Sequence, residues 1–151
     1  MNYCKRSLFS MLVMGSLLTS GCSSGWLPFS SGQLEGVPTQ APADWTEVAA
    51  KEIIQLETNV DEPYSVNLWV IGEPTHLYVF AGASRAAWIE HIDKNPNIRM
   101  KIEDAIYDLV AERVTDAAEF ERFAQSWEAK YGRRPRNENV DETYLMRLTA
   151  R

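Results

Sequence analysis

Cysteine and histidine are scarce in this chain of 151 residues, with two of each. Two histidines, His76 and His91, are too few for a zinc site unless other ligands join them. The sequence also lacks the G-x-S-x-G, H-E-x-x-H, P-loop and G-x-G-x-x-G patterns of common active and nucleotide-binding sites. We therefore expect no metal centre and no hydrolytic group of catalytic side chains.

Basic residues are outnumbered. The chain holds 15 Lys and Arg against 21 Asp and Glu, which gives a formal net charge of −6. A general nucleic-acid-binding protein needs a basic face, so this balance excludes nucleic acid as the expected partner. The length suits one domain, and a hydrophobic content of 45% is ordinary for a globular protein.

Long apolar runs are absent except near the N-terminus, at residues 7–18, directly after Lys5 and Arg6. This run is too short to cross a bilayer and has the form of a signal-peptide core. The small residues at positions 19–21 precede Cys22 and resemble the lipobox of bacterial lipoproteins. The resemblance implies acylation of Cys22 and cleavage just before it. An ordinary cleaved secretory signal is the open alternative.

Acylation would leave the mature domain without a free thiol, because Cys4 lies in the segment that is removed. The residue after the acylated cysteine is Ser23, where Asp would favour retention in the inner membrane. The resemblance therefore implies an outer-membrane protein of the bacterial cell envelope, attached through the lipid on Cys22 and facing the periplasm.

The stretch after Cys22 is rich in Ser, Gly and Pro, which is typical of a flexible tether. We expect three parts: a lipoprotein signal peptide at residues 1–21, a lipid anchor and tether at residues 22–43, and one folded domain at residues 44–151.

Alternation of apolar and polar residues predicts strands grouped as hairpins, interrupted by helical patterns. Strands are expected at residues 52–58, 64–71, 76–81, 97–103, 105–114 and 143–150. Helices are expected at residues 85–94 and 116–131, with a further short one starting at Asp44. This order favours a mostly antiparallel sheet, closed or nearly closed, with helices packed outside.

The longer helix, residues 116–131, carries one apolar stripe typical of core packing. Thr115 or Asp116 can cap its start, and Gly132 can end it. Its acids, including Glu119 and Glu121, are expected on a solvated face. The stripe consists of Phe120, Phe123, Ala124, Trp127 and Tyr131.

The shorter helix poses a question, because Arg85 stands in its expected first turn, where a cation opposes the helix dipole. Helical spacing places Arg85 on the same side as the apolar Trp88 and Ile89, and a guanidinium turned inward needs a partner. A bound phosphate, held together with the capping Ser84, would supply one. The open alternative is that Arg85 lies at the domain edge and reaches water.

A second group of cations, Arg133, Arg134 and Arg136, follows the longer helix. It can meet a phosphate or lipid headgroups, or it is an ordinary exposed loop.

The stretch "SRAAWIEHIDKNPNIRMKI", residues 84–102, follows a hairpin and resembles the pyridoxamine-phosphate-oxidase-like, FMN-binding split-barrel proteins. The rest of the domain is similar to a branch near the deazaflavin-dependent reductases. The resemblance implies an α+β, mostly β fold: a six-stranded antiparallel split barrel with two or three packed helices. It also implies FMN or a related flavin as cofactor, Ser84 and Arg85 as the residues that bind its phosphate, and a homodimer.

The sequence departs from this family at two places. Ala86 stands where the family often has lysine, and acids such as Glu57, Asp61 and Glu62 precede the hairpin. Two functions therefore stay open: a flavin-type oxidoreductase, and a non-catalytic binding or interaction lipoprotein that has kept the barrel and lost the cofactor. The sequence identifies no catalytic residue and no small-molecule substrate.

Overall fold

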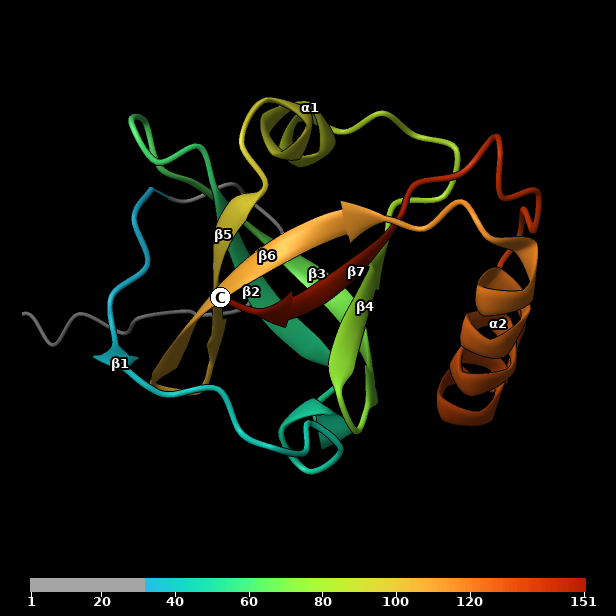
Figure 1. Ribbon diagram of the computed structural model, residues 1–151, viewed down its shortest axis with the longest axis horizontal. Helices are drawn as coiled ribbons and strands as arrows, with labels where there is room; N and C mark the ends of the chain where they lie inside the picture. The colour runs from blue at the N-terminus through green and yellow to red at the C-terminus, as the bar shows by residue number, and fades with distance from the viewer. Residues whose placement is uncertain (1–31) are drawn as a thin grey trace, which may run out of the picture.

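The computed structural model describes residues 32–151. Six antiparallel strands form a closed barrel, in the order β6-β5-β2-β3-β4-β7, and β6 pairs with β7 to close it (Figure 1). This confirms the predicted six-stranded barrel. The strands are β2 (Ile53–Thr58), β3 (Tyr64–Glu73), β4 (His76–Phe80), β5 (Asn97–Ile102), β6 (Ala105–Arg113) and β7 (Leu145–Ala150).

The barrel interior is filled by the alternate apolar side chains that the sequence pattern assigned to it. In β5, Ile98, Met100 and Ile102 are buried, whereas Arg99 and Lys101 point outward. The side chains of all six strands meet in one buried cluster. Such an interior is a packed core that leaves no room for a ligand.

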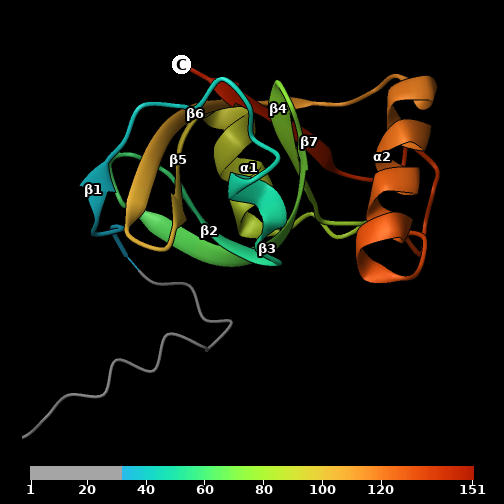
Figure 2. The same ribbon diagram turned by 90° about the horizontal axis from the view of Figure 1, so that it is seen from below.

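Helical segments cover the two ends of the barrel (Figures 1 and 2). The helix α1 (Ala87–Lys94) lies across one end and contributes Trp88 and Ile89 to the core. The short 3-10 helix η1 (Val48–Ala50) lies at the other end, where Ala49 and the neighbouring Trp45 join the same cluster.

The longer helix, α2 (Ala117–Tyr131), packs outside the barrel against the outward faces of β3, β4 and β7. Its predicted cap is confirmed, because the Asp116 carboxylate accepts a hydrogen bond from the Glu119 N–H at 2.7 Å. Its predicted end at Gly132 is also confirmed, since Gly132 adopts a left-handed conformation with a φ of 72°. The predicted stripe is buried except for the partly buried Tyr131.

The start of α1 differs from the prediction. Ala86 is its N-cap, in an extended conformation and without a side-chain cap, and the helix begins at Ala87. Ser84 does not cap it, because the chain turns first: the Ser84 N–H bonds to the Ala81 carbonyl and the Ala86 N–H to the Ser84 carbonyl. Arg85 therefore lies in this turn, ahead of the helix.

The N-terminal segment at residues 32–43, expected within the tether, lies along the barrel wall in this structure. Its strand β1 (Val37–Pro38) pairs in parallel with β6. Leu34 is buried, and its N–H and carbonyl bond to Glu57 and Arg99. The contacts of the domain thus extend upstream of Asp44. The predicted signal peptide, Cys22 and the predicted tether up to residue 31 lie outside the described residues.

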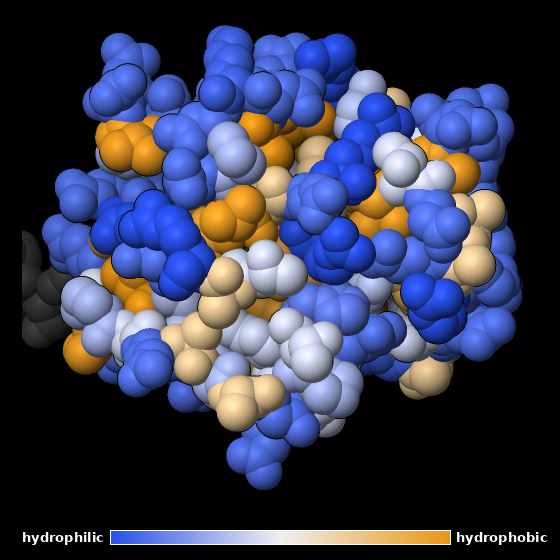
Figure 3. Space-filling model, viewed as in Figure 1, coloured by the Kyte–Doolittle hydropathy of each residue, from blue (hydrophilic) through white to orange (hydrophobic). Residues whose placement is uncertain are grey.

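The surface seen in Figure 3 is mostly hydrophilic, and apolar residues show there as small separate patches. Within residues 32–151, the length and hydropathy of each helix fall short of what crossing a membrane requires.

Candidate functional site

A hollow on the outside of the barrel is a candidate ligand site, because aromatic and basic side chains line it together. It lies between α2, the loop that follows α2, and the turn between β4 and α1. We call it the α2 hollow. Its volume is about 450 Å³, within the usual range of roughly 300–1,000 Å³ for small-molecule pockets. It is lined by Trp69, Trp127, residues 80–84 and residues 133–137.

One wall of the α2 hollow is aromatic. Trp69 is 40% exposed, and its ring stacks on Tyr131 with ring centroids 5.1 Å apart and an interplanar angle of 21°. The Tyr131 hydroxyl donates to the Val70 and Glu52 carbonyls at 2.8 and 3.1 Å, and burial raises its pKa to about 12. These bonds hold the stack in place, so the hollow presents a fixed apolar surface.

The opposite side is basic and is built around Arg134. This guanidinium contacts Glu138 at 2.6 Å, Glu121 at 2.7 Å and Glu128 at 3.8 Å. Its hydrogen bonds lower the pKa of the Glu121 and Glu138 carboxyl groups. Glu121 lies on an exposed face, as expected, and in addition it ties the loop to α2 through Arg134. The neighbouring Pro135 is buried.

The other two arginines of this loop remain available to a ligand. Arg133 and Arg136 are exposed and line the α2 hollow, and within residues 32–151 no ion pair joins either of them to a carboxylate. The Arg133 guanidinium lies 5.5 Å from the centroid of the Trp69 ring, within the range of a cation–π contact. Two guanidinium groups without anionic partners can bind an anion such as a phosphate.

Ser84 and Arg85, the predicted phosphate residues, separate in the structure. Ser84 is exposed and lines the α2 hollow. Arg85 is absent from the lining: its Nη2 bonds to Asp93 at 2.9 Å, its Nε lies 3.7 Å from Glu90, and its side chain is 56% exposed. Of the two alternatives for Arg85, the structure agrees with the position at the domain edge: the residue precedes the helix and reaches along the exposed face of α1 instead of turning toward the apolar stripe. A phosphate at these two residues stays a prediction.

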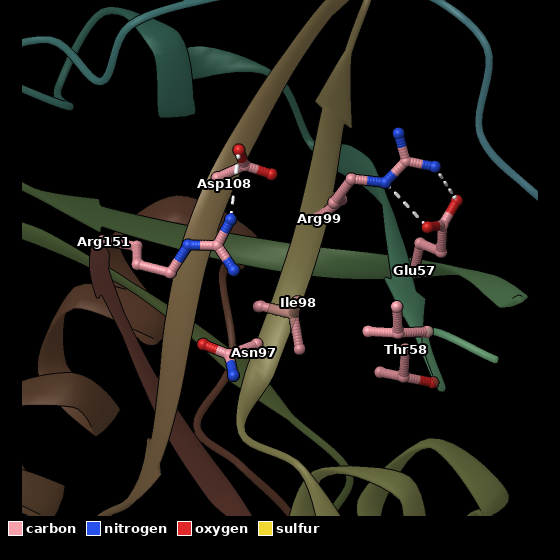
Figure 4. Close-up of a pocket in the computed structure, with 8 residues that line it drawn as sticks. Glu57, Thr58, Asn97, Ile98, Arg99, Asp108 and Arg151 are labelled. Carbon is pink, nitrogen blue, oxygen red and sulfur yellow. Dashed lines mark hydrogen bonds and ion pairs between the residues drawn. The ribbon is translucent and has the colours of Figure 1, made fainter.

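A second, smaller hollow of about 140 Å³ lies on the outward faces of β2, β5 and β6 (Figure 4). Arg99 there binds Glu57 through two hydrogen bonds of 2.7 Å, and Arg151 lies 3.3 Å from Asp108. Glu57, one of the acids that depart from the family pattern, is thus paired with Arg99 at a distance from the β4–α1 turn. Because its charged groups pair with one another, this hollow offers little to an anion.

Another polar group holds α2 on the barrel. Glu119 was expected on a solvated face, yet its carboxylate accepts from the Tyr78 hydroxyl at 2.9 Å and from Arg147 at 3.0 Å. Burial and the adjacent Glu119 raise the pKa of Tyr78.

His91, on α1, lies with Nδ1 2.9 Å from the Thr58 hydroxyl. No three His, Cys, Asp or Glu side chains of the described chain are grouped so that they could hold a metal ion.

The aromatic wall was missed by reasoning from the sequence, although a signal for it exists. Trp69 alternates with the buried Val70 in β3, so the strand period alone turns it outward. Its position against α2 depends on the packing of Trp127 and Tyr131, which sequence periodicity assigned to the core.

Comparisons with known proteins place the fold. No protein-family model matches the sequence, and no curated protein matches it. A Listeria innocua protein assigned as a pyridoxamine 5'-phosphate oxidase has a similar structure, with 14% identity and a TM-score of 0.54, over 68% of this chain and 88% of that one. A Bacteroides thetaiotaomicron protein assigned to 5-nitroimidazole antibiotic resistance also has 14% identity and a TM-score of 0.54, over 68% and 74%.

An F420 reductase is similar with 15% identity and a TM-score of 0.51, over 72% of this chain and 94% of that one. The predicted resemblance to split-barrel proteins is thereby confirmed at the level of the fold.

Proposed function

We propose that this split-barrel chain binds a phosphate-bearing, flavin-type cofactor, FMN or a close relative, in the α2 hollow and works as an oxidoreductase. One observation carries the proposal: a hollow on the barrel surface combines an aromatic wall with Ser84 and with two arginines that form no ion pair with any carboxylate of residues 32–151. Its support from outside the chain is the fold shared with proteins described as a pyridoxamine 5'-phosphate oxidase and an F420 reductase.

The residues present fit such a group. A phosphorylated flavin needs cations or hydroxyls for its phosphate and a flat apolar surface for its ring. Arg136 and Ser84 can supply the first, the exposed part of Trp69 can supply the second, and Arg133, whose guanidinium lies 5.5 Å from the centroid of the Trp69 ring, borders both. The volume of about 450 Å³ suits a ligand of this size.

When bound, a flavin carries the redox chemistry, and the protein binds and orients it. This division of labour agrees with a chain whose sequence shows no catalytic constellation. The role of this chain is to hold the phosphate end of the flavin between the β4–α1 turn and the loop after α2. Trp69 would exclude water from one face of the flavin ring.

We also propose that the domain is anchored to the outer membrane through a lipid on Cys22 and faces the periplasm. The support is the sequence before and after Cys22. The family resemblance also implies a homodimer with the cofactor between the subunits, and we propose this assembly for the present chain.

A non-catalytic binding lipoprotein is the second candidate, and one observation favours it. Arg85, the residue that the resemblance assigns to the phosphate, is tied to Asp93 and Glu90, and Ala86 follows it in place of lysine. In this case the barrel would serve as a scaffold without a flavin.

Thermal unfolding of the purified full-length chain, in detergent micelles and with increasing FMN, separates the two candidates. A ligand that binds the folded state stabilises it by about 2.7 kcal/mol at a concentration a hundredfold above its Kd. We expect FMN to raise the melting temperature, and Trp69→Ala to reduce this rise. Val60→Ala removes another exposed apolar side chain, away from the α2 hollow, and should leave the rise unchanged. No rise at any FMN concentration would support the non-catalytic candidate.

A further inference from the structure

We infer that the anion selectivity of the α2 hollow resides in Arg133 and Arg136, and that Arg85 takes no part in it. The inference rests on the proposed function, because the anion concerned is the phosphate of the flavin-type cofactor. It assigns the phosphate to the loop after α2, at residues 132–137, which lies far along the chain from the Ser84–Arg85 turn.

The arginines of the chain differ in whether they are paired. Most described arginines are bound to carboxylates or to backbone carbonyls: Arg85, Arg99, Arg113, Arg134, Arg147 and Arg151. Among residues 32–151, Arg122, Arg133 and Arg136 have no such contact, and the last two line the same hollow. The carboxylates of Glu121, Glu128 and Glu138 gather on Arg134, so the guanidinium groups of Arg133 and Arg136 are the ones that an anion in this hollow can contact.

The loop after α2 is fixed before any ligand arrives. Gly132 ends α2 in a left-handed turn, Arg134 binds acids on α2 and in the loop, and Pro135 is buried. These contacts hold the backbone of both flanking arginines. A site whose backbone is already ordered loses less conformational entropy on binding, which favours affinity.

Arg85 already has acidic partners. Its guanidinium lies against Asp93 and Glu90, so two carboxylates oppose its single positive charge. A phosphate that approached it would meet the field of both acids, which weakens the attraction. Its neighbour Ser84 carries no charge and lines the hollow, so its hydroxyl can donate to the same phosphate as Arg136.

Paired ligands test this assignment. FMN and riboflavin share the ring and differ in the phosphate, so the ratio of their Kd values measures the phosphate contribution alone. The ratio is measured by quenching of flavin fluorescence for the full-length chain in detergent micelles and for Arg133→Ala, Arg136→Ala and Arg85→Ala. Arg122→Ala is the matched control, because it removes an exposed arginine of α2 that also lacks a carboxylate partner.

We expect the wild type to prefer FMN by at least about tenfold, the scale of one charged hydrogen bond. Arg133→Ala and Arg136→Ala should each reduce this preference severalfold or more through weaker FMN binding, with riboflavin binding little changed. Arg85→Ala and Arg122→Ala should keep the preference. Loss of the preference in Arg85→Ala, with Arg136→Ala unchanged, would overturn the inference and leave the proposed function standing.

If no flavin binds, inorganic pyrophosphate tests the assignment of the anion to Arg133 and Arg136 separately from the proposal of a flavin. Protection of the wild type against thermal unfolding by pyrophosphate, lost in Arg133→Ala and Arg136→Ala and kept in Arg85→Ala, would support the arginine assignment and refute the flavin. No protection, together with no flavin binding, would overturn both.

Discussion

The buried carboxylate of Glu57 allows a sharp test of how the N-terminal segment is fastened to the barrel. Its side chain is 7% exposed, and its two oxygens accept from Arg99 Nε and Nη2 at 2.7 Å and from the Leu34 N–H. The Arg99 guanidinium also donates to the Leu34 carbonyl. One ion pair thus joins β2, β5 and the segment that leads toward Cys22.

Glu57→Gln keeps the shape of the side chain and removes its charge. The amide keeps one acceptor oxygen, but its NH₂ group would face the N–H groups of Arg99 or Leu34, which are donors as well. Charged hydrogen bonds contribute about 1.5–3 kcal/mol each, and loss of one partner from a fully buried pair costs about 3–5 kcal/mol. Because Arg99 is 30% exposed and regains water, we expect a loss of about 2–4 kcal/mol in the free energy of unfolding.

Urea titration followed by tryptophan fluorescence measures this loss, and limited proteolysis at residues 32–39 reports whether the segment detaches. The control is Glu62→Gln, which neutralises an exposed acid of the β2–β3 turn and should change stability by no more than about 0.5 kcal/mol. Equal stabilities for the two variants would refute the reasoning, and so would an unchanged rate of cleavage in Glu57→Gln.

Three further predictions follow from the structure and the sequence. Trp127→Ala should destabilise the domain by about 3–5 kcal/mol in urea titrations because Trp127 is 6% exposed, whereas the exposed Arg122→Ala should change stability by less than about 0.5 kcal/mol. Tyr131→Phe should be less stable than the wild type at pH 8. This difference should shrink from pH 10 to 12, because the unfolded state loses the Tyr131 proton first when the folded pKa is about 12. Labelling with a radioactive fatty acid should mark the wild type and not Cys22→Ser; label on the variant would contradict acylation at Cys22.

The barrel strands were predictable because their period is local. In β5, the alternation of apolar and charged residues along the sequence predicts that Ile98, Met100 and Ile102 are buried and that Arg99 and Lys101 point outward. The ends of α2 were predictable for a similar reason, since a capping carboxylate and a terminal glycine act within one helical turn.

The parts that could not be predicted depend on contacts between distant residues. β1 has two residues, one of them Pro38, and forms only because β6 offers its edge. The sequence pattern places Arg85 in the first turn of the helix, whereas α1 begins at Ala87. Its partner Asp93 is eight positions away in the chain. The α2 hollow joins β3, the β4–α1 turn and the loop after α2, and no local pattern places these three side by side.

The most direct test of the central claim is the visible absorption spectrum of the full-length chain after incubation with FMN and removal of free ligand by gel filtration. The account predicts that the flavin band elutes with the protein at close to one flavin per chain, and that Trp69→Ala and Arg136→Ala lower this ratio. A wild-type protein that elutes colourless from a saturating FMN solution would contradict the flavin site.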